Sequence, residues 1–156
     1  MTLNYFTLVH IAISVVGIVS GFGALSGWLA GKLFPGWTHS FLATTIATSV
    51  TGFFFPFRGF TPAIGVGIIS LVLLAVAAFA LYSRRLTGIW RKAFVITSVA
   101  SLYLNFFVLV AQLFQKMPAL AALAPTQSEP PFAITQLVVL ASFVALGILA
   151  TARFRN

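Results

Sequence analysis

Five long apolar runs follow one another along the chain, and the short segments between them hold most of the basic residues and prolines. A helix needs about 20 apolar residues to cross the hydrocarbon core of a bilayer. We therefore expect an all-α, polytopic membrane helix bundle that forms one integral membrane domain, residues 1–156. The predicted spans cover residues 5–30, 38–56, 62–83, 93–115 and 132–152.

The second of these runs is the least typical of a membrane span. It is short and rich in hydroxyl side chains, namely Thr44, Thr45, Thr48, Ser49 and Thr51. Such hydroxyls can donate to the carbonyl four residues earlier, so they do not require a polar pathway. An alternative to five spans is four spans plus a re-entrant second segment that ends in the Phe-rich turn at residues 52–60.

The basic residues predict how the chain is oriented. Four of them, Arg84, Arg85, Arg91 and Lys92, lie in one short hairpin between the third and fourth spans. With five spans, that side also receives Lys32, Arg153 and Arg155, and the opposite side receives Arg58 and Lys116. The positive-inside rule then puts the hairpin and the C-terminus in the cytoplasm and the N-terminus outside.

Composition agrees with a membrane location. The 156 residues are 60% hydrophobic and only 6% charged, with a mean hydropathy of +1.09, whereas a soluble domain has about 25% charged residues. The net charge of +8 would suggest nucleic acid for a soluble chain. Here the cations flank apolar runs and face phospholipid headgroups, so the bilayer is the expected partner and nucleic acid is not. In size and hydropathy the chain resembles small multi-span bacterial inner-membrane proteins.

Small residues mark the first span as a packing helix. Glycines recur on two neighbouring faces of it, Gly17 and Gly21 on one and Gly23, Gly27 and Gly31 on the other. Small side chains let helices approach closely in lipid, where no hydrophobic force holds them together. The alternative interpretation is a glycine hinge around residues 21–23 that breaks the helix and binds a ligand.

The inventory of reactive side chains is short. The chain has no cysteine, and Glu129 is its one carboxylate side chain, so a thiolate nucleophile or a carboxylate pair for acid–base work is not available. We predict no catalytic residue, no metal site and no cofactor, and we favour a protein that is not an enzyme. The histidines His10 and His39 are expected roughly 30 Å apart along the membrane normal, too far to clamp one haem. A quinone site needs little more than an apolar slot and remains open.

Polar residues of the fourth span give the best functional lead. Ser98, Ser101, Asn105, Gln112 and Gln115 fall within about 100° of helix arc. An amide that faces lipid is costly, so this stripe should face protein or water. From the helical rise, polar groups of four spans lie about 5–15 Å below the outer surface. We predict an outward-facing ligand pocket lined by His10, Asn105, Gln112 and Gln136, or, alternatively, a dry hydrogen-bonded cluster that fixes helix register.

Three classes of function follow from these patterns. The first is a structural or accessory membrane subunit that binds a partner, either a second copy or another membrane protein. The second is a binding protein or pathway for a small solute, a lipid-like molecule or an anion. The third is a quinone-linked redox subunit. A dry bundle with a lateral packing surface would favour the first class, a wet polar cavity the second, and a bound pigment the third.

Overall fold

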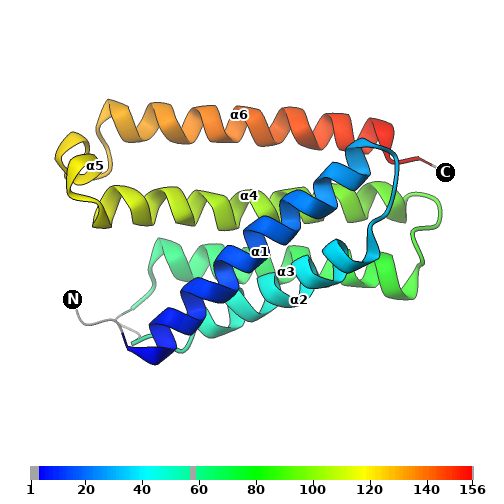
Figure 1. The fold of residues 1–156 in the computed structure, drawn as a ribbon, viewed down its shortest axis with the longest axis horizontal. Coiled ribbons are helices and arrows are strands. Elements are labelled where there is room, and N and C mark those ends of the chain that lie inside the picture. Colours follow the sequence, from blue (N-terminus) through cyan, green and yellow to red (C-terminus); the bar gives the residue numbers. More distant parts are fainter. Residues whose placement is uncertain (1–3, 57–58, 156) are drawn as a thin grey trace.

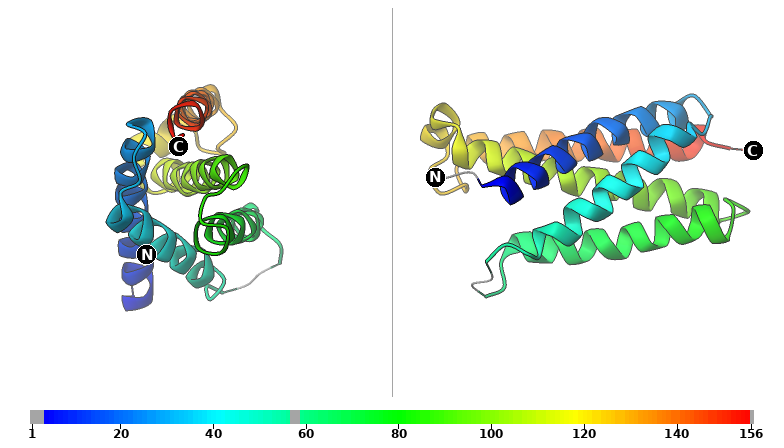
Figure 2. Two further views of the ribbon diagram at one scale, coloured as in Figure 1. Left: turned by 90° about the vertical axis from the view of Figure 1, so that its right-hand side faces the viewer. Right: turned by 60° about the horizontal axis from the view of Figure 1, so that its bottom comes forward.

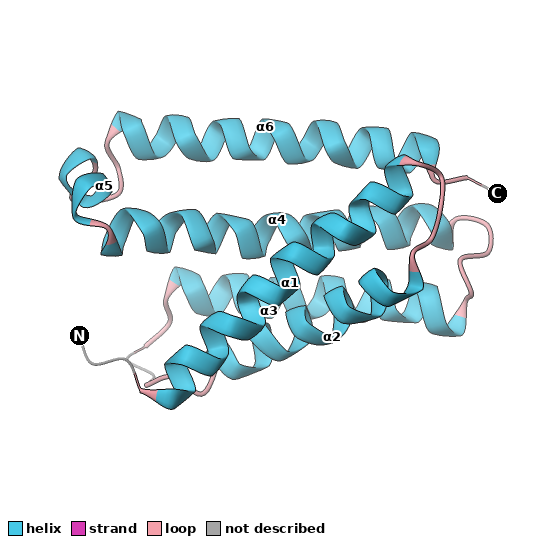
Figure 3. Cartoon of the chain, in the orientation of Figure 1, coloured by secondary structure: helices cyan, strands magenta, loops and turns pink. Residues whose placement is uncertain are grey.

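The structure is a computed structural model that describes residues 4–56 and 59–155. Within those residues it contains helices and turns and no strand, so the prediction of an all-α bundle is confirmed (Figures 1 and 3). The elements are α1 (Tyr5–Leu29), α2 (Pro35–Gly52), α3 (Pro62–Ala78), the π-helical turn η1 (Phe79–Ser83), α4 (Trp90–Lys116), α5 (Pro118–Leu123) and α6 (Pro130–Arg153).

Local sequence signals set several helix ends. Asn4 caps α1 by accepting a hydrogen bond from the Thr7 amide at 2.8 Å, and Thr61 caps α3 in the same way. Each of the helices α2, α3, α5 and α6 begins at a proline, where the missing amide hydrogen costs nothing. Gly31, with φ of +74°, follows the end of α1 and lets the chain turn back toward α2.

The long helices form a row of three with two helices on one side. Viewed nearly end-on, α3, α4 and α6 lie side by side, and α1 and α2 cross the same face of that row (Figure 2). The central helix, α4, contacts every other helix. No helix of the described residues covers the opposite face of the row (Figure 2), and this one-sided arrangement positions the groove described below.

Within the part of the chain that the structure describes, four helical segments are long and apolar enough to cross a membrane: Tyr5–Leu29, Pro62–Ser83, Trp90–Lys116 and Pro130–Arg153. These correspond to four of the five predicted spans. The remaining helix, α2, has 18 residues and is too rich in hydroxyls to meet the same criterion. It is nevertheless one continuous helix that runs back along α1 (Figure 2). The structure therefore supports four candidate spans, and a fifth crossing by α2 stays a prediction.

The glycines of α1 lie where neighbouring groups come close. A Cβ atom on Gly21 would sit 2.6 Å from Leu102 Cδ1, and one on Gly23 would sit 2.4 Å from the Trp37 ring. On Gly27 it would meet the Lys32 carbonyl oxygen at 2.9 Å. These distances leave no room for a side chain, so α2, the turn that precedes it and α4 can pack directly on the α1 backbone.

Most of the basic residues gather at one end of the bundle. There the Arg84 guanidinium lies 5.3 Å from the Trp90 ring and Arg91 lies 4.6 Å from the Phe154 ring, and Arg153 donates to the Leu29 carbonyl. The π-helical turn η1 ends α3 at this end, with an Arg84 amide to Phe79 carbonyl bond of 3.0 Å. Lys116 lies at the other end of α4; Arg58 lies outside the described residues.

Candidate functional site

His10 is tied to α2 rather than to the other predicted pocket residues. Its Nδ1 lies 2.7 Å from Thr51 Oγ1, and its ring packs edge-on against Phe55. Thr51 already donates its hydroxyl hydrogen to the Ala47 carbonyl at 2.7 Å, so it accepts a hydrogen bond from His10. This requires the proton on Nδ1. The imidazole thus links α1 to the end of α2.

Asn105 is paired with α1. Its Oδ1 accepts from the Ser14 hydroxyl at 3.0 Å, and its Nδ2 donates to the Ser14 carbonyl at 3.5 Å. Gly17, one turn further along α1, makes room for the amide, because a Cβ there would lie 3.4 Å from Asn105 Nδ2 and 3.0 Å from Thr45 Oγ1. The contact therefore joins α1, α2 and α4 at one level of the bundle.

Gln136 and Gln112 lie on the α4 and α6 side. The Gln136 side chain is buried on α6 and donates from Nε2 to the Phe107 carbonyl of α4 at 3.2 Å. Gln112 is half-buried on α4. Nearby, Gln127 links the α5–α6 loop to α4 through its bond to the Ala111 carbonyl at 2.9 Å.

These contacts place the four predicted pocket residues in the same half of the bundle, away from the basic end, but in separate pairs. Each of His10, Asn105 and Gln136 bonds to a different neighbouring helix, and no two of the four share a hydrogen bond among the described residues. The hydroxyls of α2 follow the expected pattern, because Thr44, Thr48 and Thr51 each donate to a carbonyl four residues earlier. Whether the four residues bind a ligand remains a prediction.

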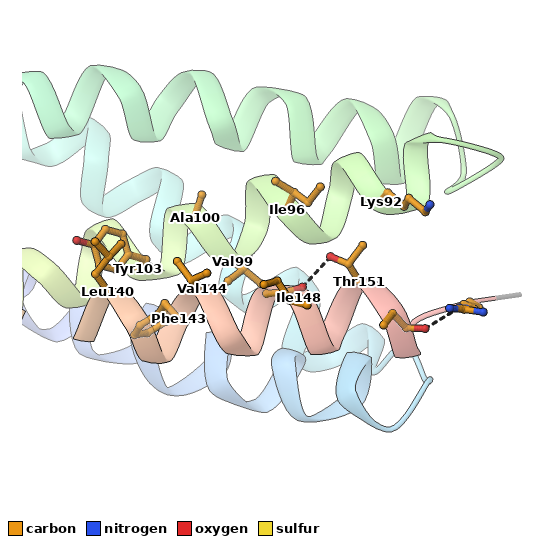
Figure 4. Close-up of a pocket in the computed structure, with 13 residues that line it drawn as sticks. Lys92, Ile96, Val99, Ala100, Tyr103, Leu140, Phe143, Val144, Ile148 and Thr151 are labelled. Carbon is orange, nitrogen blue, oxygen red and sulfur yellow. Dashed lines mark hydrogen bonds between the residues drawn. The ribbon is translucent and has the colours of Figure 1, made fainter. Parts of the chain in front are cut away.

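A different hollow lies between α4 and α6, on the face of the row that α1 and α2 leave open. This groove, which we call the α4/α6 groove, has a volume of about 900 Å³. Figure 4 shows its walls, with α1 and α2 behind it. From α4 it is lined by Lys92, Ile96, Val99, Ala100 and Tyr103, and from α6 by Leu140, Phe143, Val144, Gly147, Ile148, Thr151, Ala152 and the adjoining Arg155.

The α4/α6 groove covers only the half of the helices nearer the basic end. From Lys92 to Tyr103 the helical rise gives a length of roughly 17 Å, about half of the 30 Å hydrocarbon thickness. Tyr103 and Phe143, with ring centroids 5.7 Å apart, form its inner end. Beyond them a second apolar cluster fills the space between α4 and α6, where Phe114 packs edge-on against Phe132.

The two ends of the α4/α6 groove differ in chemistry. Lys92 and Arg155, both exposed, stand at the mouth, and the walls between them and Tyr103 are almost entirely apolar. The groove can therefore hold a long apolar body along its length and an anion at its mouth.

Sequence reasoning did not identify this groove. Its residues are ordinary for a membrane helix, and Lys92 carried a signal for topology alone. The available signal was a stripe of mostly apolar residues at helical spacing on each of two spans. Each stripe contains a small residue, Ala100 or Gly147, and has a cation at the basic end of the bundle. That signal cannot say which two spans are neighbours, because the order of the helices depends on the whole bundle.

Comparison with known proteins adds no family for this chain. No protein-family model matches it, and neither a similar curated protein nor a similar solved structure was found.

Proposed function

We propose that the chain is an accessory membrane protein that binds a membrane lipid laterally, from the bilayer, in the α4/α6 groove. We further propose that it is neither a solute pathway nor an enzyme subunit. The observation that carries this proposal is the groove itself. It is apolar, it opens on the side of the helix row that α1 and α2 leave uncovered (Figure 2), and it ends halfway along the helices.

The polar residues support the same proposal. His10, Asn105 and Gln136 have their hydrogen bonds with neighbouring helices, which is how polar groups in a membrane bundle fix the positions of helices. A solute pathway would need such groups to be free for the solute. Their engagement favours a rigid, dry bundle that works through its outer surface.

The length of the groove favours a lipid over a partner helix. A transmembrane helix crosses about 30 Å of hydrocarbon and would need a groove along both halves of the bundle. A lipid of one leaflet needs about half of that depth. Beyond Tyr103 the second apolar cluster occupies the space between α4 and α6 in the other half of the bundle. The space in the α4/α6 groove therefore matches a lipid from the leaflet at the basic end.

We also propose that this leaflet is the cytoplasmic one and that α2 crosses the membrane as a fifth span. The concentration of cations at one end supports this orientation through the positive-inside rule. Reporter fusions should then give a cytoplasmic signal at Gly88 and at the C-terminus, and an outside signal near Gly59 and Thr126. Opposite locations for Gly88 and the C-terminus would contradict the model.

The lipid proposal is tested by filling the groove. Val144 lines the groove and is 51% exposed, whereas Val138 is a 60% exposed valine of the same helix that does not line it. We expect the protein to retain lipid during purification in mild detergent, as counted by native mass spectrometry. Val144→Trp should lose this lipid, and the matched control Val138→Trp should keep it.

Three outcomes would overturn the proposal. The wild-type protein could carry no lipid, the two tryptophan variants could behave alike, or extraction could recover a quinone in place of a phospholipid. The last outcome would favour a quinone-linked redox subunit instead, because Tyr103 offers a hydroxyl at the inner end of the α4/α6 groove.

A further inference from the structure

We infer that the lipid in the α4/α6 groove is an anionic phospholipid, whose phosphate is held by Lys92 and Arg155 at the mouth and whose acyl chain lies along Ile96, Val144 and Ile148. This inference rests on the proposed function and adds the headgroup chemistry to it. It depends on which cations at the basic end line the groove and which are held by contacts elsewhere in the protein.

Three other arginines at the basic end already have specific contacts. Arg84 lies over the rings of Phe79 and Trp90, and Arg91 lies over the Phe154 ring. Arg153 donates to a carbonyl of α1. These contacts hold the three side chains against the protein and away from the groove.

Lys92 and Arg155 differ from these arginines because both line the mouth of the groove, and both are exposed there. Arg155 donates from Nε to the Ala152 carbonyl at 2.6 Å. This bond fixes the plane of the guanidinium beside the groove and uses one of its five N–H groups, so four remain for an anion. Arginine is well suited to phosphate because its planar N–H groups can contact two oxygens at once.

No side chain of this protein can neutralise that pair. Glu129 is the one carboxylate side chain in the sequence, and it bonds to Thr126 and Ser128 in the α5–α6 loop, at the opposite end of α6. Because no side chain can supply the negative charge, we assign it to a bound anion. At the membrane surface the most abundant source is the headgroup of an anionic lipid, and each nearby cation contributes about 1 kcal/mol to its attraction.

The test compares lipid selectivity in the whole protein. Wild type and variants are reconstituted in bilayers that contain equal amounts of phosphatidylcholine and phosphatidylglycerol, and the lipids retained after mild detergent extraction are identified by native mass spectrometry. We expect enrichment of phosphatidylglycerol on the wild type. Lys92→Gln and Arg155→Gln should each reduce the phosphatidylglycerol-to-phosphatidylcholine ratio by about five-fold, the factor that corresponds to one such charge.

Arg85→Gln is the matched control, because Arg85 is an exposed cation of the same hairpin that does not line the groove. It should leave the ratio unchanged. An equal loss in Arg85→Gln would overturn the inference, because it would indicate attraction by the whole basic end. If lipid is retained without any preference for phosphatidylglycerol, the inference fails but the proposed function stands. If no lipid is retained at all, the proposed function fails.

Discussion

The two sides of α4 hold their neighbouring helices in different ways. Toward α1, α4 presents Leu102, which lies against Gly21, and the paired amide of Asn105. Toward the open face it presents Ile96, Ala100 and Tyr103, and in its basic half the contact with α6 leaves a groove. Apolar contact alone gives little net attraction in a bilayer, because lipid tails are as apolar as the helices. Close backbone packing and hydrogen bonds therefore define the α1–α2–α4 side, whereas the α4–α6 side has space for a lipid.

This comparison predicts opposite effects of one substitution at two glycines. Gly21 and Gly147 both face α4, but an added Cβ would lie 2.6 Å from Leu102 at Gly21 and 3.4 Å from Val99 at Gly147. Gly21→Ala should reduce the free energy of unfolding by about 1–3 kcal/mol because the contact is overpacked. Gly147→Ala should raise it by up to about 1 kcal/mol because alanine favours helix. Unfolding titrations in mixed micelles would measure both, and equal changes would remove the distinction between the two sides.

The next largest effect is expected from the pair of Ser14 and Asn105. Asn105→Leu removes both hydrogen bonds to α1 and should cost about 1 kcal/mol of unfolding free energy. In a double-mutant cycle with Ser14→Ala, the coupling energy should be about 0.6 kcal/mol, the average for hydrogen bonds between membrane helices. A coupling energy of zero would show that the pair does not fix the position of α1. Retained stability together with loss of a bound solute would instead support the predicted polar pocket.

Sequence reasoning could predict the contact between Ser14 and Asn105 in part, for a physical reason. An amide in the middle of a span must find a polar partner, and the helical rise, counted from the ends of the predicted spans, puts Ser14 and Asn105 at the same depth of about 15 Å. The partner of Gln136 could not be found in this way. Its side chain reaches a backbone carbonyl, that of Phe107, and every residue of α4 has such a carbonyl.

The positions of the helices could be predicted from the sequence, whereas the α4/α6 groove could not. Apolar runs, prolines and capping residues determine where the helices begin and end, so the helix bounds agree with the predicted segments to within four residues. The largest difference is at the second segment, whose helix begins at Pro35 and ends at Gly52, three and four residues earlier than predicted. The groove depends on which helices are neighbours, and no short-range pattern specifies that order.

A smaller effect is expected on the α4–α6 side, at Gln136. Its Nε2 bonds to the Phe107 carbonyl, and its buried Oε1 has no partner among the described residues. Phe107 lies within α4, where its carbonyl also accepts a bond from the helix backbone. Gln136→Leu therefore removes one weak hydrogen bond, but it also removes the buried Oε1, which has no partner within the described part of the chain. Because these two effects oppose each other, the unfolding free energy should change by less than about 0.5 kcal/mol. A loss as large as that of Asn105→Leu would mean that hydrogen bonding holds both sides of α4 alike.

The smallest effect concerns pH and the loop that joins α5 to α6. The Thr126 hydroxyl, with help from the amides of Thr126 and Ser128, lowers the pKa of Glu129 below its ordinary value. A carboxylate whose pKa is lowered in the folded state stabilises the loop above its ordinary pKa, and this contribution is lost as the pH falls through the lowered value. Because Glu129 bonds to Thr126 and Ser128 of the same surface loop, the effect should stay within that loop.

Amide hydrogen exchange at Thr126 and Ser128 measures this contribution. Protection should not change between about pH 7 and pH 5, and it should decrease only when the pH falls below the usual range for a glutamate. Glu129→Gln should show the decreased protection at every pH, while the bond between Gln127 and Ala111 keeps the rest of the loop on α4. If Glu129→Gln also changed the lipid selectivity at the α4/α6 groove, the two ends of the α4–α6 side would be coupled, and the groove could not be treated as a separate site.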